Sequence, residues 1–158
     1  FPTRRSSDLV RIGAALYGIN PQRDMPNPLK SVVGLKLSVL QIRTTETDVS
    51  VGYGAAGFAK AGTRLAVVAG GYADGVHRTL GLNPIGMVDG KYVQSVGRIS
   101  MDSCVFDISS INSDPEYIDV VSQEITIDTL INNNKFLGYE VLTSLGRRYL
   151  RCYLPVKE

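Results

Sequence analysis

Two tyrosines of the chain lie in short glycine-rich stretches, where a side chain can face a ligand instead of the core. Tyr53 stands in VGYGAAG and Tyr72 in AGGYADG. Glycine permits left-handed backbone and a close approach of the main chain to another group. A phenol can carry a proton, but its ordinary pKa of about 10 makes it a poor base at neutral pH unless neighbours stabilise the phenolate. The alternative is a turn residue with a buried ring.

Arginines stand close to the same stretches and supply positive charge. Arg78 follows the second stretch, Arg98 precedes the pair Met101-Asp102, and Arg11 lies in VRIG near the start of the chain. A guanidinium stays protonated and only donates hydrogen bonds, so it suits carboxylates, phosphates or an unprotonated ring nitrogen. Taken alone, each arginine is better explained as a surface charge or as one half of an ion pair.

The chain offers little for metal chemistry. It has two cysteines, Cys104 and Cys152, and one histidine, His77. These three residues cannot complete a structural zinc site, which needs four ligands. We expect no metal, and we expect both cysteines to be reduced thiols, as in a cytosolic protein. Nothing in the pattern gives His77 a role in proton transfer.

The composition is that of a globular protein with one core. The 158 residues are 44% hydrophobic and 20% charged, with a net charge of +2. The basic residues form no stripe interleaved with aromatics, and the small group Arg147, Arg148 and Arg151 is expected to be a solvated helix end. No apolar run is long enough to span a bilayer. The sequence therefore favours neither nucleic acid nor a membrane as a partner.

Apolar residues alternate with polar ones from Ser31 onward, which predicts strands. The alternation over 31–45 slips at Val39-Leu40 and indicates a β-bulge there. Asp89-Gly90 between two apolar runs predicts a hairpin over 85–97, because both residues tolerate the left-handed backbone of a tight turn.

Other segments of the chain predict further strands, one loop and one helix. Over 98–109 we expect the side chains of Ile99, Met101, Cys104 and Phe106 to point mostly inward. Further strands are expected over 63–71, 118–127 and 148–155, a loop with short strands over 46–62, and a single helix over 138–148. These elements predict a mainly β fold, a small β-barrel with one late helix.

The first thirty residues differ from the rest. Residues 10–21 are a short apolar run, ended by Gly18 and Pro21, that predicts a buried strand, and the proline-containing segment 22–30 is interpreted as a linker. The opening FPTRRSSDL, residues 1–9, has no apolar stretch typical of a signal peptide. It resembles the translated end of a sequencing-library adapter, and we interpret it as a non-native scar ahead of Val10.

Four segments, RIGAALYGINP, VSVGYGAA, VAGGYADGVHR and VGRISMD, together resemble the C-terminal part of the alanine racemase family. They cover about residues 10–110, and LTSLGRRYLRCY resembles the family more loosely. Members use pyridoxal 5'-phosphate (PLP) and combine an N-terminal (β/α)8 barrel with a C-terminal β domain. The resemblance implies that 10–30 ends the PLP-binding barrel, with 10–20 as its last strand, and that 31–158 is the β domain. No lysine here stands in the family's PLP-lysine motif, so the chain is expected to be incomplete and inactive alone.

The resemblance implies a role for several residues toward catalysis and PLP. Tyr53 matches the tyrosine that acts as the second base in the partner subunit's active site. Arg11 matches the arginine that donates to the pyridine nitrogen of PLP. Gly13 and Ala14 match main-chain positions that bind its phosphate. Many members have a phosphate-binding tyrosine near the C-terminus, where a loose alignment places Arg147, with Tyr149 as the nearby candidate.

Other residues are implied to bind or admit substrate. Met101 matches the residue whose main-chain N–H meets the substrate carboxylate, with its side chain expected in the core. Tyr72, Arg78 and Arg98 match residues that line the route by which substrate enters, where arginines attract carboxylates. Asp102 is expected to hold its loop in place.

The resemblance also implies partners and a compartment. The subunits of the family pair head to tail as homodimers and make D-alanine for peptidoglycan precursors in the bacterial cytosol. We therefore expect an exposed apolar patch around the Tyr53 and Met101 loops. Two alternatives stay open: a racemase of another or broad amino-acid specificity, and a free-standing β-barrel that binds RNA or a protein.

Overall fold

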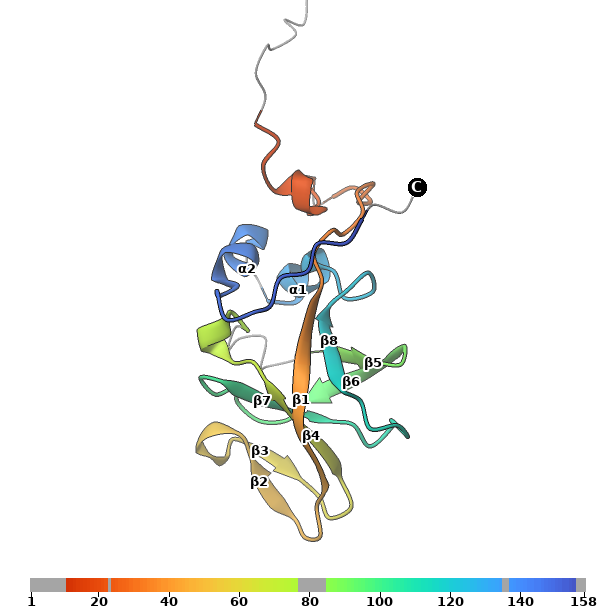
Figure 1. The fold of residues 1–158 in the computed structure, drawn as a ribbon, viewed down its shortest axis with the longest axis vertical. Helices are drawn as coiled ribbons and strands as arrows, with labels where there is room; N and C mark the ends of the chain where they lie inside the picture. The colour runs from red at the N-terminus through yellow and green to blue at the C-terminus, as the bar shows by residue number, and fades with distance from the viewer. Residues whose placement is uncertain (1–10, 23, 77–84, 135–136, 156–158) are drawn as a thin grey trace, which may run out of the picture.

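The computed structural model describes residues 11–22, 24–76, 85–134 and 137–155, and its centre is a closed antiparallel β-barrel (Figure 1). Neighbouring strands follow the order β1-β4-β7-β6-β5-β8 around the barrel. The strands are β1 (Leu35–Thr44), β4 (Arg64–Ala69), β5 (Ile85–Val88), β6 (Lys91–Ser95), β7 (Ser103–Asp107) and β8 (Tyr117–Val121). The predicted mainly β fold with a small barrel is confirmed.

Strand β1 closes the barrel because it pairs with two neighbours along its length. Its first half pairs with β8, with Leu37 opposite Ile118, and its second half pairs with β4. The register with β4 shifts between Val39 and Gln41, and Leu40 at the shift is exposed. This confirms the predicted bulge, which bends the strand and lets one element serve both sides of the closure.

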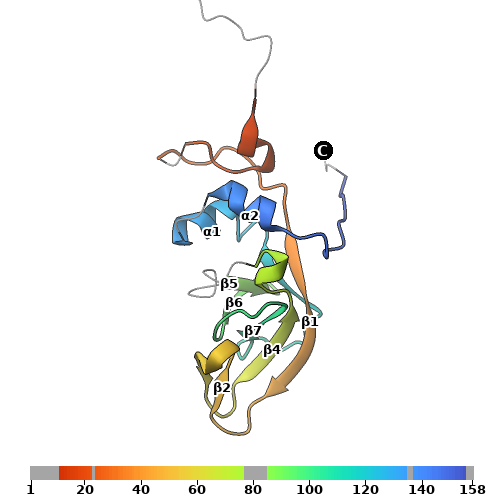
Figure 2. The same cartoon turned by 90° about the vertical axis from the view of Figure 1, so that its left-hand side faces the viewer.

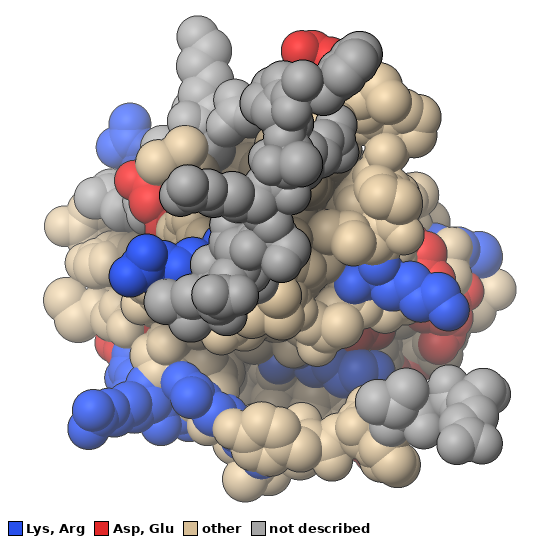
Figure 3. Space-filling model, turned by 90° about the horizontal axis from the view of Figure 1, so that it is seen from above, with Lys and Arg blue, Asp and Glu red and all other residues tan. Residues whose placement is uncertain are grey.

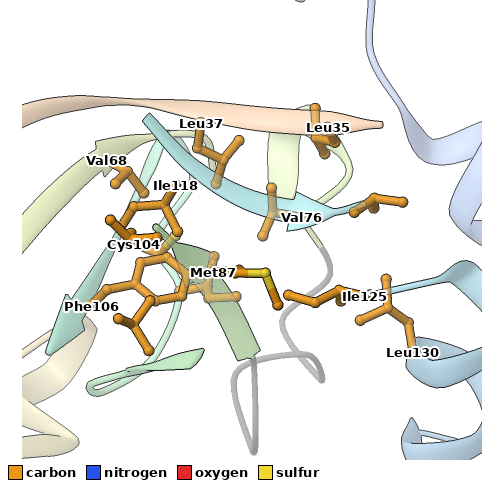
Figure 4. Packing of buried hydrophobic residues seen from close by; sticks show 14 of the residues in the cluster. Leu35, Leu37, Val68, Val76, Met87, Cys104, Phe106, Ile118, Ile125 and Leu130 are labelled. Atoms are coloured by element: carbon orange, nitrogen blue, oxygen red, sulfur yellow. The ribbon is translucent and has the colours of Figure 1, made fainter. Parts of the chain in front are cut away.

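The barrel interior is filled by apolar side chains from facing strands. Leu37, Phe106 and Ile118 are at most 1% exposed, and Met87 and Cys104 pack beside them (Figure 4). Each fully buried large side chain of this kind stabilises the fold by roughly 1.5–3 kcal/mol. The alternation read from the sequence therefore locates the core.

Two hairpins carry the tight turns of the fold. Asp89 and Gly90, between β5 and β6, have φ of 49° and 73°, so the predicted turn is confirmed with both central residues left-handed. The second hairpin, β2 (Val49–Val51) with β3 (Gly57–Ala59), is a separate two-stranded sheet. A 3-10 helix, Tyr53–Ala55, connects its strands.

Two helices, α1 (Ile127–Asn134) and α2 (Gly138–Ser144), lie between the barrel and the N-terminal segment (Figures 1 and 2). The prediction of one helix over 138–148 was wrong in number and length. Strand β8 stops at Val121, and Thr126 caps α1 by accepting the N–H of Thr129. The sequence does not predict α1, because three of its residues are asparagines, which have low helix propensity. The helix depends instead on packing of Leu130 and Ile131 against the core.

Two predicted strands are absent from the described residues. Within 10–18 the chain forms a 3-10 helix, Gly13–Tyr17, which Gly18 ends with a φ of 78°. Residues 148–155 form no strand, and Leu150 and Tyr153 are almost fully exposed. The closed barrel leaves no free strand edge for either segment to join.

Candidate functional site

The loop between β6 and β7 connects the two tyrosine-bearing stretches. The N–H of Tyr53 donates to the carbonyl of Arg98 over 3.3 Å, and the N–H of Tyr72 donates to the carbonyl of Ser100 over 3.0 Å. Met101 follows directly on the same loop. Residues from three separate parts of the sequence are therefore held together by main-chain hydrogen bonds.

Glycines let these loops approach each other closely. Gly52 has a φ of 80°, and a Cβ there would lie only 2.7 Å from the nitrogen of Arg98. A Cβ on Gly71 would collide with the carbonyl of Met101. The glycine-rich sequence around each tyrosine is thus explained by backbone contact with the β6–β7 loop.

The side chains on these loops face outward. Tyr53 is 65% exposed, Met101 53% and Tyr72 41%, and Phe58 on the neighbouring β3 is also exposed. The expectation of a core position for the Met101 side chain was wrong. Strand β7 begins only at Ser103, so the inward-outward alternation does not extend back to Met101. Large exposed side chains therefore lie on the loops where an apolar patch was expected.

Arg148 pairs with one residue on each of two loops: the turn over 71–75 that contains Tyr72, here called the Tyr72 turn, and the β6–β7 loop. Its Nε donates to Asp74 Oδ1 over 2.7 Å, and its Nη2 donates to Asp102 Oδ1 over 2.8 Å. These hydrogen bonds to Asp102 and Asp74 raise the pKa of the guanidinium. Reading Arg148 as a solvated helix end was therefore wrong: α2 ends at Ser144, and Arg148 is paired. Arg147 and Arg151 are exposed.

A second group of candidate residues lies on the N-terminal segment. Gly13 has a φ of 65°, and a Cβ there would collide with the hydroxyl of Tyr139 on α2. The same segment is tied down where Asp128 accepts the N–H of Asn20 over 3.1 Å. Arg11 is exposed at its start.

The sequence analysis gives no role to Tyr139 and names Tyr149 as the nearby candidate for phosphate binding. Tyr149 instead packs against the barrel core, and its hydroxyl is buried with no hydrogen-bond partner in the described part of the chain. Burial, with a further contribution from Asp74, raises the pKa of Tyr149 to about 12. The sequence did hold one signal for Tyr139. The Gly138-Tyr139 pair stands at the start of the predicted helix, beside the apolar face by which that helix has to pack.

The two groups of residues lie at opposite ends of the molecule. The β2–β3 hairpin, with the 3-10 helix that begins at Tyr53, is at one end of the barrel (Figures 1 and 2). The N-terminal segment with Gly13 lies beyond the helices at the other end. One copy of the chain therefore does not bring Tyr53 to the Gly13–Tyr139 contact.

Comparison with known proteins gives one consistent result. Residues 32–153 match the family model "Alanine racemase, C-terminal domain". The chain belongs to the alanine racemase family. It is 42% identical to the alanine racemase of Rhodospirillum rubrum over 96% of this chain and 41% of that protein. It is 39% identical to the catabolic alanine racemase of Agrobacterium fabrum, covering 92% of this chain and 39% of that one.

Solved structures of alanine racemases have the same fold. The crystal structure of the Bartonella henselae enzyme, with covalently bound pyridoxal phosphate, superposes with a TM-score of 0.82 at 33% identity. The match covers 90% of this chain and 40% of that one. The chain thus spans about two-fifths of the length of the alanine racemases it matches.

Other features of this alanine racemase domain bear on its partners. Lys and Arg form separate groups on the face seen from above, several of them beside acidic residues (Figure 3). No described helix is long and apolar enough to cross a membrane. Within the described ranges, His, Cys, Asp and Glu form no cluster that could hold a metal. His77 and Arg78 lie outside the described residues, as do residues 1–9, which we interpreted as a scar.

Proposed function

We propose that this chain is the C-terminal part of a PLP-dependent alanine racemase, which interconverts L- and D-alanine, and that Tyr53 acts in the active site of a partner subunit. Membership of the family supports the reaction. The separation of Tyr53 from the Gly13–Tyr139 contact supports the second subunit, because one copy holds the two groups apart and a head-to-tail pair would bring them together.

The N-terminal segment fits a phosphate-bearing cofactor. Gly13 leaves a space without a side chain beside the Tyr139 hydroxyl, and a main-chain N–H and a hydroxyl together suit a phosphate oxygen. We assign phosphate binding to Gly13, Ala14 and Tyr139, with Tyr139 in place of Tyr149. Arg11 would donate a hydrogen bond to the pyridine nitrogen and keep it unprotonated, since a guanidinium has donors but no acceptor for a protonated ring nitrogen.

The exposed loops serve the substrate. PLP, when bound, withdraws electrons from the amino acid and acidifies its α-proton. Tyr53 holds or delivers a proton on one face of the α-carbon, and the other base belongs to the part of the protein that carries PLP. The N–H of Met101 receives the substrate carboxylate. By the resemblance we assign Tyr72, Arg78 and Arg98 to the approach for a carboxylate-bearing substrate, and Asp102 to holding the β6–β7 loop in place.

On this proposal the protein is a homodimer of the bacterial cytosol and supplies D-alanine for peptidoglycan precursors. The exposed side chains of Tyr53, Phe58 and Met101 support a protein partner at these loops, because large exposed apolar surface is typical of interaction sites. Both described cysteines are free thiols, in keeping with a reducing compartment.

Mixing two inactive variants tests the contribution of a second subunit. A complete enzyme is made by joining residues 10–158 to the preceding part of the Rhodospirillum rubrum alanine racemase, and is called the hybrid below. Tyr53→Phe and Arg11→Ala hybrids are each expected to be inactive. After they are unfolded and refolded together, half of the dimers have one intact site, so about a quarter of the activity returns. If mixing restores nothing, Tyr53 serves its own subunit.

A further inference from the structure

We propose that Arg148 is a positioning residue for the substrate-binding loops. Its guanidinium fixes the position of the Tyr72 turn relative to the β6–β7 loop, which carries Met101. The inference rests on the proposed function, because it assumes that Met101 and Tyr72 face substrate. The Arg148 guanidinium forms ion pairs with Asp74 and Asp102 and is not itself assigned a contact with substrate.

The two carboxylates belong to different loops. Asp74 closes the Tyr72 turn, because its Oδ2 accepts the N–H of Gly71 over 3.0 Å. Asp102 follows Met101 on the β6–β7 loop, and its carbonyl accepts the N–H of Gly70 over 2.9 Å. Arg148 donates to both side chains at once, so it spans the junction of the two loops.

The segment that carries Arg148 is itself fixed to the Tyr72 turn. The N–H of Gly146 donates to the carbonyl of Asp74 over 3.3 Å, and Ser144 Oγ donates to the carbonyl of Gly75 over 3.4 Å. A Cβ on Gly75 would collide with the carbonyl of Ser144. The guanidinium is therefore held by its own backbone as well as by its two carboxylates.

Charge and burial explain why an arginine is required. The Asp74 side chain is 8% exposed, and a carboxylate at that depth needs a cation or several donors. Arg148 supplies Nε to Asp74 and Nη2 to Asp102, whereas a lysine has one nitrogen and reaches both only if the loops move. The Arg148 side chain is 58% exposed, so the pair with exposed Asp102 contributes little to stability. Its main effect is on loop geometry.

Kinetics of the hybrid test this role. We expect Arg148→Gln to raise KM for alanine about tenfold, as expected for misplacing one hydrogen bond to a charged group, with kcat within about threefold. Arg148→Lys is expected to give an intermediate KM. The matched control is Lys36→Gln, which removes an exposed cation paired with Asp119 on the barrel wall, and it should change neither constant.

Amide spectra of this 158-residue chain give a second readout that does not need activity. Arg148→Gln and Asp102→Asn should both shift the amide signals of Met101 and Tyr72, and the double variant should add no further shift. An unchanged KM, or Met101 and Tyr72 signals that stay in place, overturns the proposal. An inactive unmodified hybrid contradicts the proposed function instead, and the amide shifts still decide whether Arg148 positions the loops.

Discussion

The N–H of Tyr53 donates to the carbonyl of Arg98 at 3.3 Å, so the loop that presents the phenol rests on the β6–β7 loop. The same β6–β7 loop carries Met101 and accepts the N–H of Tyr72. The position of the proposed base is therefore coupled to the position of the proposed carboxylate-binding group, although 48 residues of sequence separate Tyr53 and Met101.

Replacing Gly52 by alanine should disturb this contact. The new Cβ would lie 2.7 Å from the nitrogen of Arg98, in a backbone conformation with a φ of 80°. Gly54→Ala is the control, because its φ is 66° but nothing lies within 4 Å of its Cβ. We expect Gly54→Ala to cost about 1–2 kcal/mol of unfolding free energy, from the left-handed backbone alone, and Gly52→Ala to cost more. Urea unfolding measures both, and equal costs would contradict the close approach.

Tyr139 and Tyr149 should respond differently to loss of the hydroxyl. Tyr139→Phe in the hybrid removes a proposed phosphate contact and should weaken PLP binding about tenfold, measured by absorbance titration. Tyr149→Phe should leave PLP binding unchanged. Its stability should hold or rise by up to about 1 kcal/mol, because the lost hydroxyl is buried without a partner among the described residues. The reverse pattern would restore Tyr149 as the phosphate ligand.

Two phenylalanines test where the core lies. Phe106 is 1% exposed inside the barrel, and Phe58 is 58% exposed on β3. Phe106→Ala should lower the unfolding free energy by roughly 3–5 kcal/mol, and Phe58→Ala by less than about 1 kcal/mol. Comparable losses at the two positions would show that the β2–β3 hairpin is buried in the isolated chain.

The two thiols should differ in reactivity. Cys152 is exposed, whereas burial raises the pKa of Cys104 to about 12. In the native chain a thiol reagent at pH 8 should modify one cysteine, and both only after unfolding. Rapid modification of both would contradict the burial of Cys104.

The same raised pKa predicts alkaline destabilisation. Between about pH 9 and 12 the unfolded chain has lost the Cys104 proton while the folded chain keeps it. Stability therefore falls with rising pH, by about 1.4 kcal/mol per pH unit for each such proton. Tyr149 adds to the fall above its ordinary pKa of about 10. Cys104→Ala should flatten the decline, as measured by urea unfolding at several pH values, and an unchanged slope would contradict the assignment.

Local patterns in the sequence predicted much of the barrel. Alternation located β1 and β7, and the apolar segment 63–71 was correctly predicted as the strand that is β4. The slip at Val39-Leu40 and the Asp89-Gly90 turn were correct because each depends on backbone preferences of adjacent residues. Helix α1 was not predicted, and the irregular 148–155 segment was predicted as a strand. Packing of the helix and closure of the barrel determine these structures, and both are long-range effects.

The site was predictable where short motifs specify it. The motifs around Tyr53, Tyr72 and Met101 identified loops that the structure brings together. The Arg148 bridge joins residues 46 or more positions apart, and no local pattern in the sequence predicts it. For the Gly13–Tyr139 contact, the only local signal in the sequence is the Gly138-Tyr139 pair at the start of the predicted helix. The roles assigned to the individual site residues stay predictions.

Proton exchange in the Tyr53→Phe hybrid tests the central claim most directly. The rate at which each enantiomer of alanine exchanges its α-proton for deuterium is measured in D2O, with absorbance reporting bound PLP. We expect racemisation and exchange from one enantiomer to fall by about 100-fold or more, while exchange from the other enantiomer and PLP binding persist. Tyr92→Phe, an exposed tyrosine on β6, is the control. Racemisation at the normal rate in the Tyr53→Phe hybrid would contradict the account.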